Sequence, residues 1–201
     1  MPYTQHQAIV LHSFLPSRQK VSLFDASAGR LDTTFRSAAS CALMQGALIT
    51  YESHLWKGRT MIEGLTLCKL PQPWVCQDLL FLHHVLEMIH YFSPEHSHAK
   101  RLFEFLLFLY EEQPEAQSDL LLVKRLFIAK LFALLGIYPE GVERSELRSL
   151  FYMLTTGDKT QADRLTDEQL HTTLKTWLWE CVQTHPQVEQ FKTVSFLNTV
   201  E

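Results

Sequence analysis

The chain has 201 residues, of which 46% are hydrophobic, and it carries a net charge of −4 at neutral pH. This length and apolar content can build a proper core, which excludes a largely disordered protein and allows one large domain or two small ones. The charge is uneven, because residues 1–70 hold seven Lys and Arg against four Asp and Glu, whereas the remainder carries a balance of −7. The first third is therefore better suited to a polyanion.

Cysteine spacing and the N-terminus indicate a reduced, cytoplasmic setting. No Cys-x-x-Cys pair occurs, and Met1 leads directly into polar residues without the apolar core of a secretion signal. The most apolar stretch, residues 120–137, is interrupted by Lys124, Arg125 and Lys130. Charges there are costly in a bilayer, so we predict a buried helix and no membrane contact. The four cysteines are Cys41, Cys68, Cys76 and Cys181.

Two short strands that form a hairpin are the clearest local pattern. In residues 20–25 and 30–36, apolar side chains recur at every second position on both sides of an Ala28-Gly29 break. The pattern predicts one apolar face on this hairpin. The other face of its second strand, which we expect to meet water or a ligand, carries Arg30, Asp32, Thr34 and Arg36.

Three further strands are predicted around this hairpin. Residues 8–11 begin the first, residues 46–51 lead a long fourth, and residues 60–68 form the fifth after a turn at 56–59. Five strands in so short a stretch predict a closed or nearly closed β-barrel, since closure removes exposed edges. The oligonucleotide-binding barrel is one such fold.

Pro71-Gln72-Pro73 marks the expected domain boundary, because two prolines in three residues resist both the strand and an earlier helix start. After it the apolar period changes to about three and a half, which is typical of helices. We therefore predict an α+β protein, with a five-stranded oligonucleotide-binding barrel over residues 1–71 and an α-helical bundle domain over residues 72–201. Its helices are expected over residues 79–92, 102–110, 120–137, 147–154 and 166–181.

No common catalytic motif occurs in the sequence. The patterns GxxxxGK[ST], GxSxG, HExxH and GxGxxG are all absent. His83, Glu87 and His90 share one helix face at a spacing that could hold a metal ion, which leaves a metal-dependent enzyme as a remote alternative. The leucines around them already explain the helix, so we expect no enzyme, no metal site and no cofactor.

Six cations fall on strands or turns of the predicted barrel. Phosphate binding needs cations along a groove, and single-stranded nucleic acid also needs aromatic rings on which bases stack. The candidate DNA-binding cations are Arg18, Lys20, Arg30, Arg36, Lys57 and Arg59. The candidate stacking rings are Phe14, Phe24, Tyr51 and Trp56. The alternative is that the cations are ordinary solvated charges and the rings belong to the core.

Several segments together share the pattern of one known family. In the first third these are QAIVLHSFLPSRQKVSLFDASAGRLDTTFRS, QGALITYES and KGRTMIEGLTL. Beyond Pro73 they are LEMIHYFSPEHSHAKRLFEFLLFL, VKRLFIAKLFALLGIYPE and LKTWLWECVQTHPQVEQFKTVSFL. The G-R turn, the GAL element before the fourth strand and the LLG-aromatic helix ending carry most of the likeness. The chain resembles the RecO family of bacterial recombination mediators over nearly its whole length.

The resemblance implies a non-enzymatic DNA-repair protein. RecO proteins bind single- and double-stranded DNA, anneal complementary strands, and act with RecR and the single-strand binding protein to load RecA. By position, Arg30 matches the family's basic turn residue. Lys124 and Arg125 match the basic pair of its central helix, near the site for the acidic tail of the single-strand binding protein. A cytoplasmic, nucleoid-associated protein is implied.

A second hypothesis stays open beside this one. The helical part is acidic, and the segment after the third strand, residues 35–40, carries a single cation, Arg36. These features are compatible with a protein-interaction module of the same architecture that has little DNA affinity.

Overall fold

A computed structural model describes residues 4–13, 20–35, 43–56, 59–95, 100–111, 120–138, 147–148, 150 and 168–192. The chain divides into two compact units, Met1–Gln113 and Pro114–Glu201. The change from strands to helices comes at Pro71, as the sequence predicts, whereas the division between the compact units comes only after three further helices. These three helices are therefore part of the same compact unit as the strands.

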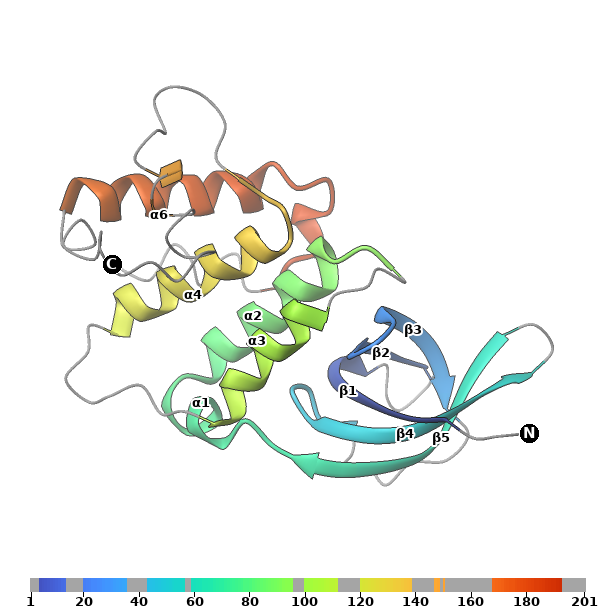
Figure 1. Ribbon diagram of the computed structural model, residues 1–201. Helices are drawn as coiled ribbons and strands as arrows, with labels where there is room; N and C mark the ends of the chain where they lie inside the picture. The colour runs from blue at the N-terminus through green and yellow to red at the C-terminus, as the bar shows by residue number, and fades with distance from the viewer. Residues whose placement is uncertain are drawn as a thin grey trace. The chain divides into compact units, whose positions relative to one another are not determined.

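Five strands form a closed barrel in the first unit (Figure 1). The strands are β1 (Thr4–Ser13), β2 (Lys20–Asp25), β3 (Gly29–Phe35), β4 (Leu48–Trp56) and β5 (Arg59–Lys69). They follow the order β1-β2-β3-β5-β4, and β4 pairs with β1 to complete the circle. All neighbours are antiparallel except β3 and β5. The predicted α+β fold, with a barrel of the oligonucleotide-binding kind followed by helices, is confirmed.

The barrel core comes from the alternation that the sequence shows. On β3, Leu31, Thr33 and Phe35 are buried while Asp32 between them is exposed. The buried cluster inside the barrel consists of Ala8, Val10, Val21, Leu23, Phe35, Leu43, Ala47, Ile49, Tyr51, Ile62 and Leu65. All five strands contribute, so the core depends on closure of the whole barrel and not on any single hairpin.

Strand β2 departs from the prediction of a hairpin with one apolar face. Its residues from Val21 to Asp25 are all buried, so both faces are covered. On the outer side, the ring of Phe24 stacks on Phe103 with centroids 6.4 Å apart, and the Ser22 hydroxyl lies 3.0 Å from Nδ1 of His90. The helices that follow the barrel therefore cover β2, whereas the outer face of β3, which carries the exposed Asp32, stays partly open.

Three helices complete the first unit: α1 (Gln72–Gln77), α2 (Leu79–Phe92) and α3 (Lys100–Glu111). Asp78 caps α2, because its side chain accepts a hydrogen bond from the Phe81 amide at 2.9 Å. The Tyr110 hydroxyl near the end of α3 donates to the Gly46 carbonyl at 2.8 Å. Contacts of this kind join α2 and α3 to the barrel.

The second unit contains α4 (Leu120–Leu134), α6 (Glu168–Gln183) and a 3-10 helix, η4 (Val188–Gln190). Phe132 of α4 meets Trp177 of α6 edge to face, with centroids 5.7 Å apart. Gly136 follows α4 with a φ of 77°, and the amide of Ile137 bonds back to the Phe132 carbonyl, which ends the helix. In the described part of the chain, no helix has both the length and the apolar character needed to cross a membrane.

Candidate nucleic-acid interface

The strand register brings together the segments that carry several predicted cations. Lys20 at the start of β2 lies opposite Thr34 near the end of β3. Thr34 in turn lies beside Met61 near the start of β5. Adjacent strands are about 5 Å apart, so the start of β2, the end of β3 and the start of β5 form one continuous surface. The Thr33 hydroxyl, which donates to the Thr60 carbonyl at 2.7 Å, holds β3 and β5 together there.

Two of the six predicted cations lie at this junction. The side chain of Lys20 is exposed, and Arg59 is the first residue of β5, although the structure describes only its backbone. Arg36 is the next residue in the sequence after Phe35, but it lies outside the described residues, as do Arg18 and Lys57. Positions 18 and 57 fall in the connections between β1 and β2 and between β4 and β5.

Arg30 lies apart from Lys20, at the other end of the β2–β3 hairpin. It pairs with Phe24, four residues along β2 from Lys20, which corresponds to about 13 Å of extended chain. Its side chain is 17% exposed, and Nη2 donates to the Glu95 carboxylate at 2.7 Å and lies 3.6 Å from Asp32. Nη1 donates to the main-chain carbonyls of His90 and Ser93. The guanidinium is thus engaged on several sides within its own unit.

Two of the four predicted stacking rings, Phe24 and Tyr51, are part of the core. Phe24 is fully buried and Tyr51 is 2% exposed, so neither ring can receive a base, and that interpretation was wrong for both. Alternation could not reveal this, because the covering of Phe24 comes from Phe103 in a distant helix. The side chain of Trp56 is not described, and Phe14 lies outside the described residues.

A buried carboxylate that sequence analysis missed organises the β2–β3 turn. Asp25 accepts hydrogen bonds from the amide and hydroxyl of Ser27 and from the Ala28 amide, each at 2.7 Å, and from the Tyr51 hydroxyl at 2.8 Å. Burial by itself would raise the pKa of Asp25, but these hydrogen bonds outweigh it and hold the pKa below its ordinary value. Burial and the Asp25 charge in turn raise the pKa of Tyr51. An Asp followed by a Ser two positions later is the local signal for such a turn.

His6 extends this network toward the surface. Its Nε2 lies 3.0 Å from the Ser53 hydroxyl, its Nδ1 lies 3.7 Å from the Asp25 carboxylate, and its ring stacks on Tyr51. The longer distance exceeds a hydrogen bond, so Ser53, His6 and Asp25 lack the continuous hydrogen-bonded chain of an acyl-transfer triad. Strand β4 is also paired on both sides at Ser53, which leaves no open edge there to form an oxyanion site.

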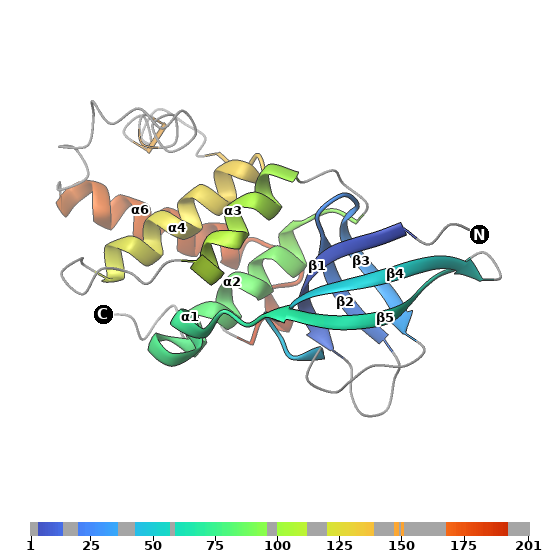
Figure 2. The same ribbon diagram turned by 60° about the horizontal axis from the view of Figure 1, so that its bottom comes forward.

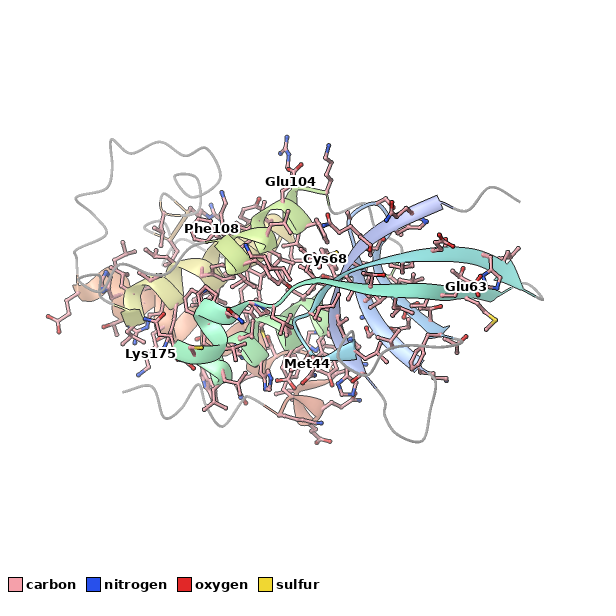
Figure 3. All side chains as sticks on the ribbon, turned by 90° about the horizontal axis from the view of Figure 1, so that it is seen from below. Met44, Glu63, Cys68, Glu104, Phe108 and Lys175 are labelled. Atoms are coloured by element: carbon pink, nitrogen blue, oxygen red, sulfur yellow. The ribbon has the colours of Figure 1, made fainter. Side chains whose placement is uncertain are left out.

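The β4–β5 ribbon carries a pair of acidic side chains, Glu52 and Glu63. Figure 2 shows these two strands running side by side. In Figure 3, Glu63 lies in the half of β5 that begins at Arg59, and Cys68 lies near the end at Lys69. Glu63 lies directly opposite Glu52 in the register, and Nδ1 of His54 is 3.5 Å from the Glu63 carboxylate. Like charges placed opposite each other disfavour a phosphate backbone on this face.

The helical residues predicted to bind a partner lie on α4. Lys124 and Arg125 are both half-buried, as are the neighbouring residues 121–123 and 126. The first part of α4 therefore presents apolar and cationic groups that are all partly accessible. Toward its end, Phe127, Ile128 and Leu131 are buried, in agreement with the predicted buried helix.

The alternative of a metal-dependent enzyme has no support among the described residues. No three His, Cys, Asp or Glu side chains lie close enough there to hold a metal ion. His90, one of the three residues at metal-ligand spacing, instead lies against Ser22 of the barrel.

No protein-family model matches the chain, and no curated protein matches it.

Proposed function

We propose that the chain is a DNA-binding protein of recombinational repair that resembles RecO and acts by binding and not by catalysis. In this proposal the barrel binds and anneals DNA, and the helices bind RecR and the single-strand binding protein, so that RecA can be loaded. The observation that carries it is the closed five-stranded barrel, whose register places Lys20 beside the strand ends that lead to Arg36 and Arg59. Association with the nucleoid would follow from this activity.

The proposed binding surface is the junction of strand ends and not the middle of the barrel wall. In barrels of this type, ligands lie across strands 2 and 3 and between the loops that follow strands 1 and 4. Here the helices cover the outer face of β2, and Arg30 is engaged with Glu95 and His90. Five cations remain as the candidate phosphate contacts. These are Lys20 and Arg59 of the strands, and Arg18, Arg36 and Lys57 of the adjoining segments.

A salt titration with single-stranded DNA tests this proposal. The observed affinity falls as salt rises, and each phosphate contact makes the slope of log K against log salt more negative by about 0.7. Removal of three cations should therefore make the slope less negative by about 2. The test variant is K20A/K57A/R59A. The matched control is K100A/R101A/K175A, because Lys100, Arg101 and Lys175 are exposed on α3 and α6. Electrostatic binding at this junction would be refuted if the wild type had no detectable affinity for single-stranded DNA at low salt. It would also be refuted if the test and control variants lost the same affinity.

The proposed site for the acidic tail of the single-strand binding protein is the first part of α4. Partly exposed apolar residues beside Lys124 and Arg125 suit a peptide that carries both carboxylates and apolar side chains. A K124E/R125E variant should lose capture by the single-strand binding protein, whereas K175E on α6 of the same unit should keep it. Equal capture by both variants would remove these two residues from the proposal.

A protein-interaction module with little DNA affinity is the second candidate. The acidic Glu52–Glu63 face and the internal engagement of Arg30 favour it. A variant that lacks the charges of Arg36, Lys57 and Arg59 decides between the two candidates. If this variant still complements a repair-deficient strain and binds RecR, the second candidate holds; if repair is lost while RecR binding persists, DNA binding is required.

A further inference from the structure

The last two turns of α2 are joined to the barrel through His90. Its Nδ1 lies 3.0 Å from the hydroxyl of Ser22, a residue of β2 that is fully buried. The backbone carbonyl of His90 accepts a hydrogen bond from Arg30 on β3. The His12 ring of β1 lies 6.4 Å from the His90 ring, and Nε2 of Gln45 lies 3.1 Å from Nδ1 of His12. One histidine of α2 thus meets three strands, and we call these contacts the His90 joint.

The surroundings of His90 favour its neutral form. Burial lowers the pKa of His90 first of all, and the positive charge of Arg30 lowers it further, as does His12. Asp32 on β3 and Glu87 on α2 act in the opposite direction but do not compensate. The Tyr91 ring packs edge-on against the His90 ring, with centroids 4.9 Å apart. The remaining neighbours, Ser22 and Gln45, carry no charge. A protonated ring would therefore be a partly buried cation next to a guanidinium.

We propose that the His90 joint is a proton-sensitive element: protonation of the imidazole releases the C-terminal turn of α2 from β2. Loss of the hydrogen bond is not the cause, since the Ser22 hydroxyl can accept from an imidazolium as readily as it can donate to a neutral ring. The cause is the positive charge, which the joint must bury beside Arg30. Release would uncover the outer face of β2 around Ser22, a face that is closed at neutral pH.

The direction of the effect follows from proton linkage. The released ring has its ordinary proton affinity, with a pKa near 6.5, and the docked ring has a lower one. The released state therefore binds more protons, so acidification favours it. The joint weakens as the pH falls below about 6.5 and reaches its minimum below the lowered pKa. Each unit by which docking lowers the pKa corresponds to a tenfold shift in the equilibrium.

Amide hydrogen exchange of the full chain tests the proposal. Protection factors, corrected for intrinsic exchange, are measured between pH 7.5 and 5 for the amides of the last turn of α2 and for the Ser93 amide, which bonds to the Ile89 carbonyl at 3.0 Å. Acid also weakens the whole unit over this range, because unfolding exposes the buried His84, whose pKa is lowered to about 4, and core amides of β4 report that general loss. As the pH falls, the amides at the end of α2 should lose more protection than the core amides of β4.

Two variants separate His90 from general acid sensitivity. H90Q keeps a side chain that can bond to Ser22 but cannot be protonated, so in this variant the end of α2 should lose no more protection than the core amides of β4. H83Q makes the same change at a half-buried histidine of α2 and should behave like the wild type. Equal loss of protection in H90Q and the wild type would overturn the proposal. If H90Q does not fold, a nuclear magnetic resonance titration of the wild type decides, and a His90 pKa at or above 6.5 would refute it.

Discussion

Nη1 of Arg30 donates to the main-chain carbonyl of His90, so that a side chain of β3 holds the last turn of α2. A helix leaves its final carbonyls without internal partners and carries partial negative charge at that end, which makes a guanidinium a favourable cap. The Ser93 carbonyl, 3.3 Å from the same nitrogen, is a second acceptor of this kind. Arg30 therefore has a structural role in its own unit, separate from any role with DNA.

Replacement of Arg30 should destabilise the first unit more than it weakens DNA binding. We expect R30A to lower the free energy of unfolding by about 2 kcal/mol, because charged hydrogen bonds to partly buried carbonyls are lost. E95A should cost less than about 1 kcal/mol, since Glu95 is 52% exposed and exposed ion pairs contribute little. Urea denaturation measures both. A stability loss for R30A no larger than for E95A would show that the carbonyl contacts are unimportant.

The Asp25 network should be sensitive both to mutation and to strong acid. We expect D25N to cost about 2 to 3 kcal/mol, because an amide cannot accept all four hydrogen bonds, and Y51F to cost about 1 kcal/mol, because three remain. The folded pKa of Asp25 is below its ordinary 3.8, so its contribution is present above pH 3.8 and is lost as the pH falls through the lowered pKa. Urea denaturation at pH 7 and pH 3 should therefore show a smaller D25N penalty at pH 3. An equal penalty at both values would contradict this.

His84 should make the first unit sensitive to milder acid. Burial lowers the pKa of His84 from 6.5 to about 4, so the unfolded state binds a proton more readily, and stability falls as the pH drops from 6.5 toward 4. The shift corresponds to a loss of up to about 3 kcal/mol. Urea denaturation at pH 7 and pH 4.5 should show this loss in the wild type and in the control H83L. In H84L it should be much reduced; an undiminished loss there would place the acid sensitivity elsewhere.

Gly46 should tolerate substitution less well than Gly64, although both have a positive φ. A Cβ at Gly46 would lie 3.2 Å from Cγ of Pro71, whereas at Gly64 the nearest atoms belong to the Glu52 side chain at 3.9 Å. G64A should cost about 1 kcal/mol of backbone strain, and G46A should cost that strain plus the displacement of Pro71, about 2 kcal/mol or more. Thermal denaturation compares them. Equal costs would mean that Pro71 yields without penalty.

The barrel and the helices could be predicted from the sequence because their signals are local. Alternation at every second residue marks β3, the paired prolines mark the end of β5, and the changed apolar period marks α2. Each of these patterns depends on residues a few positions apart, which share a face of the same element. The closed barrel then follows from the need to remove exposed strand edges.

The sequence alone could determine which side chains are charged and which strands alternate, but not which of them remain accessible. Arg30 donates hydrogen bonds to groups about sixty residues away in the sequence, at His90 and Glu95. Phe24, a predicted stacking ring, is covered by Phe103. The junction of Lys20 with the ends of β3 and β5 also appears only once the barrel closes. These facts depend on distant segments packing together, and the period of a single strand carries no information about what lies against its outer face.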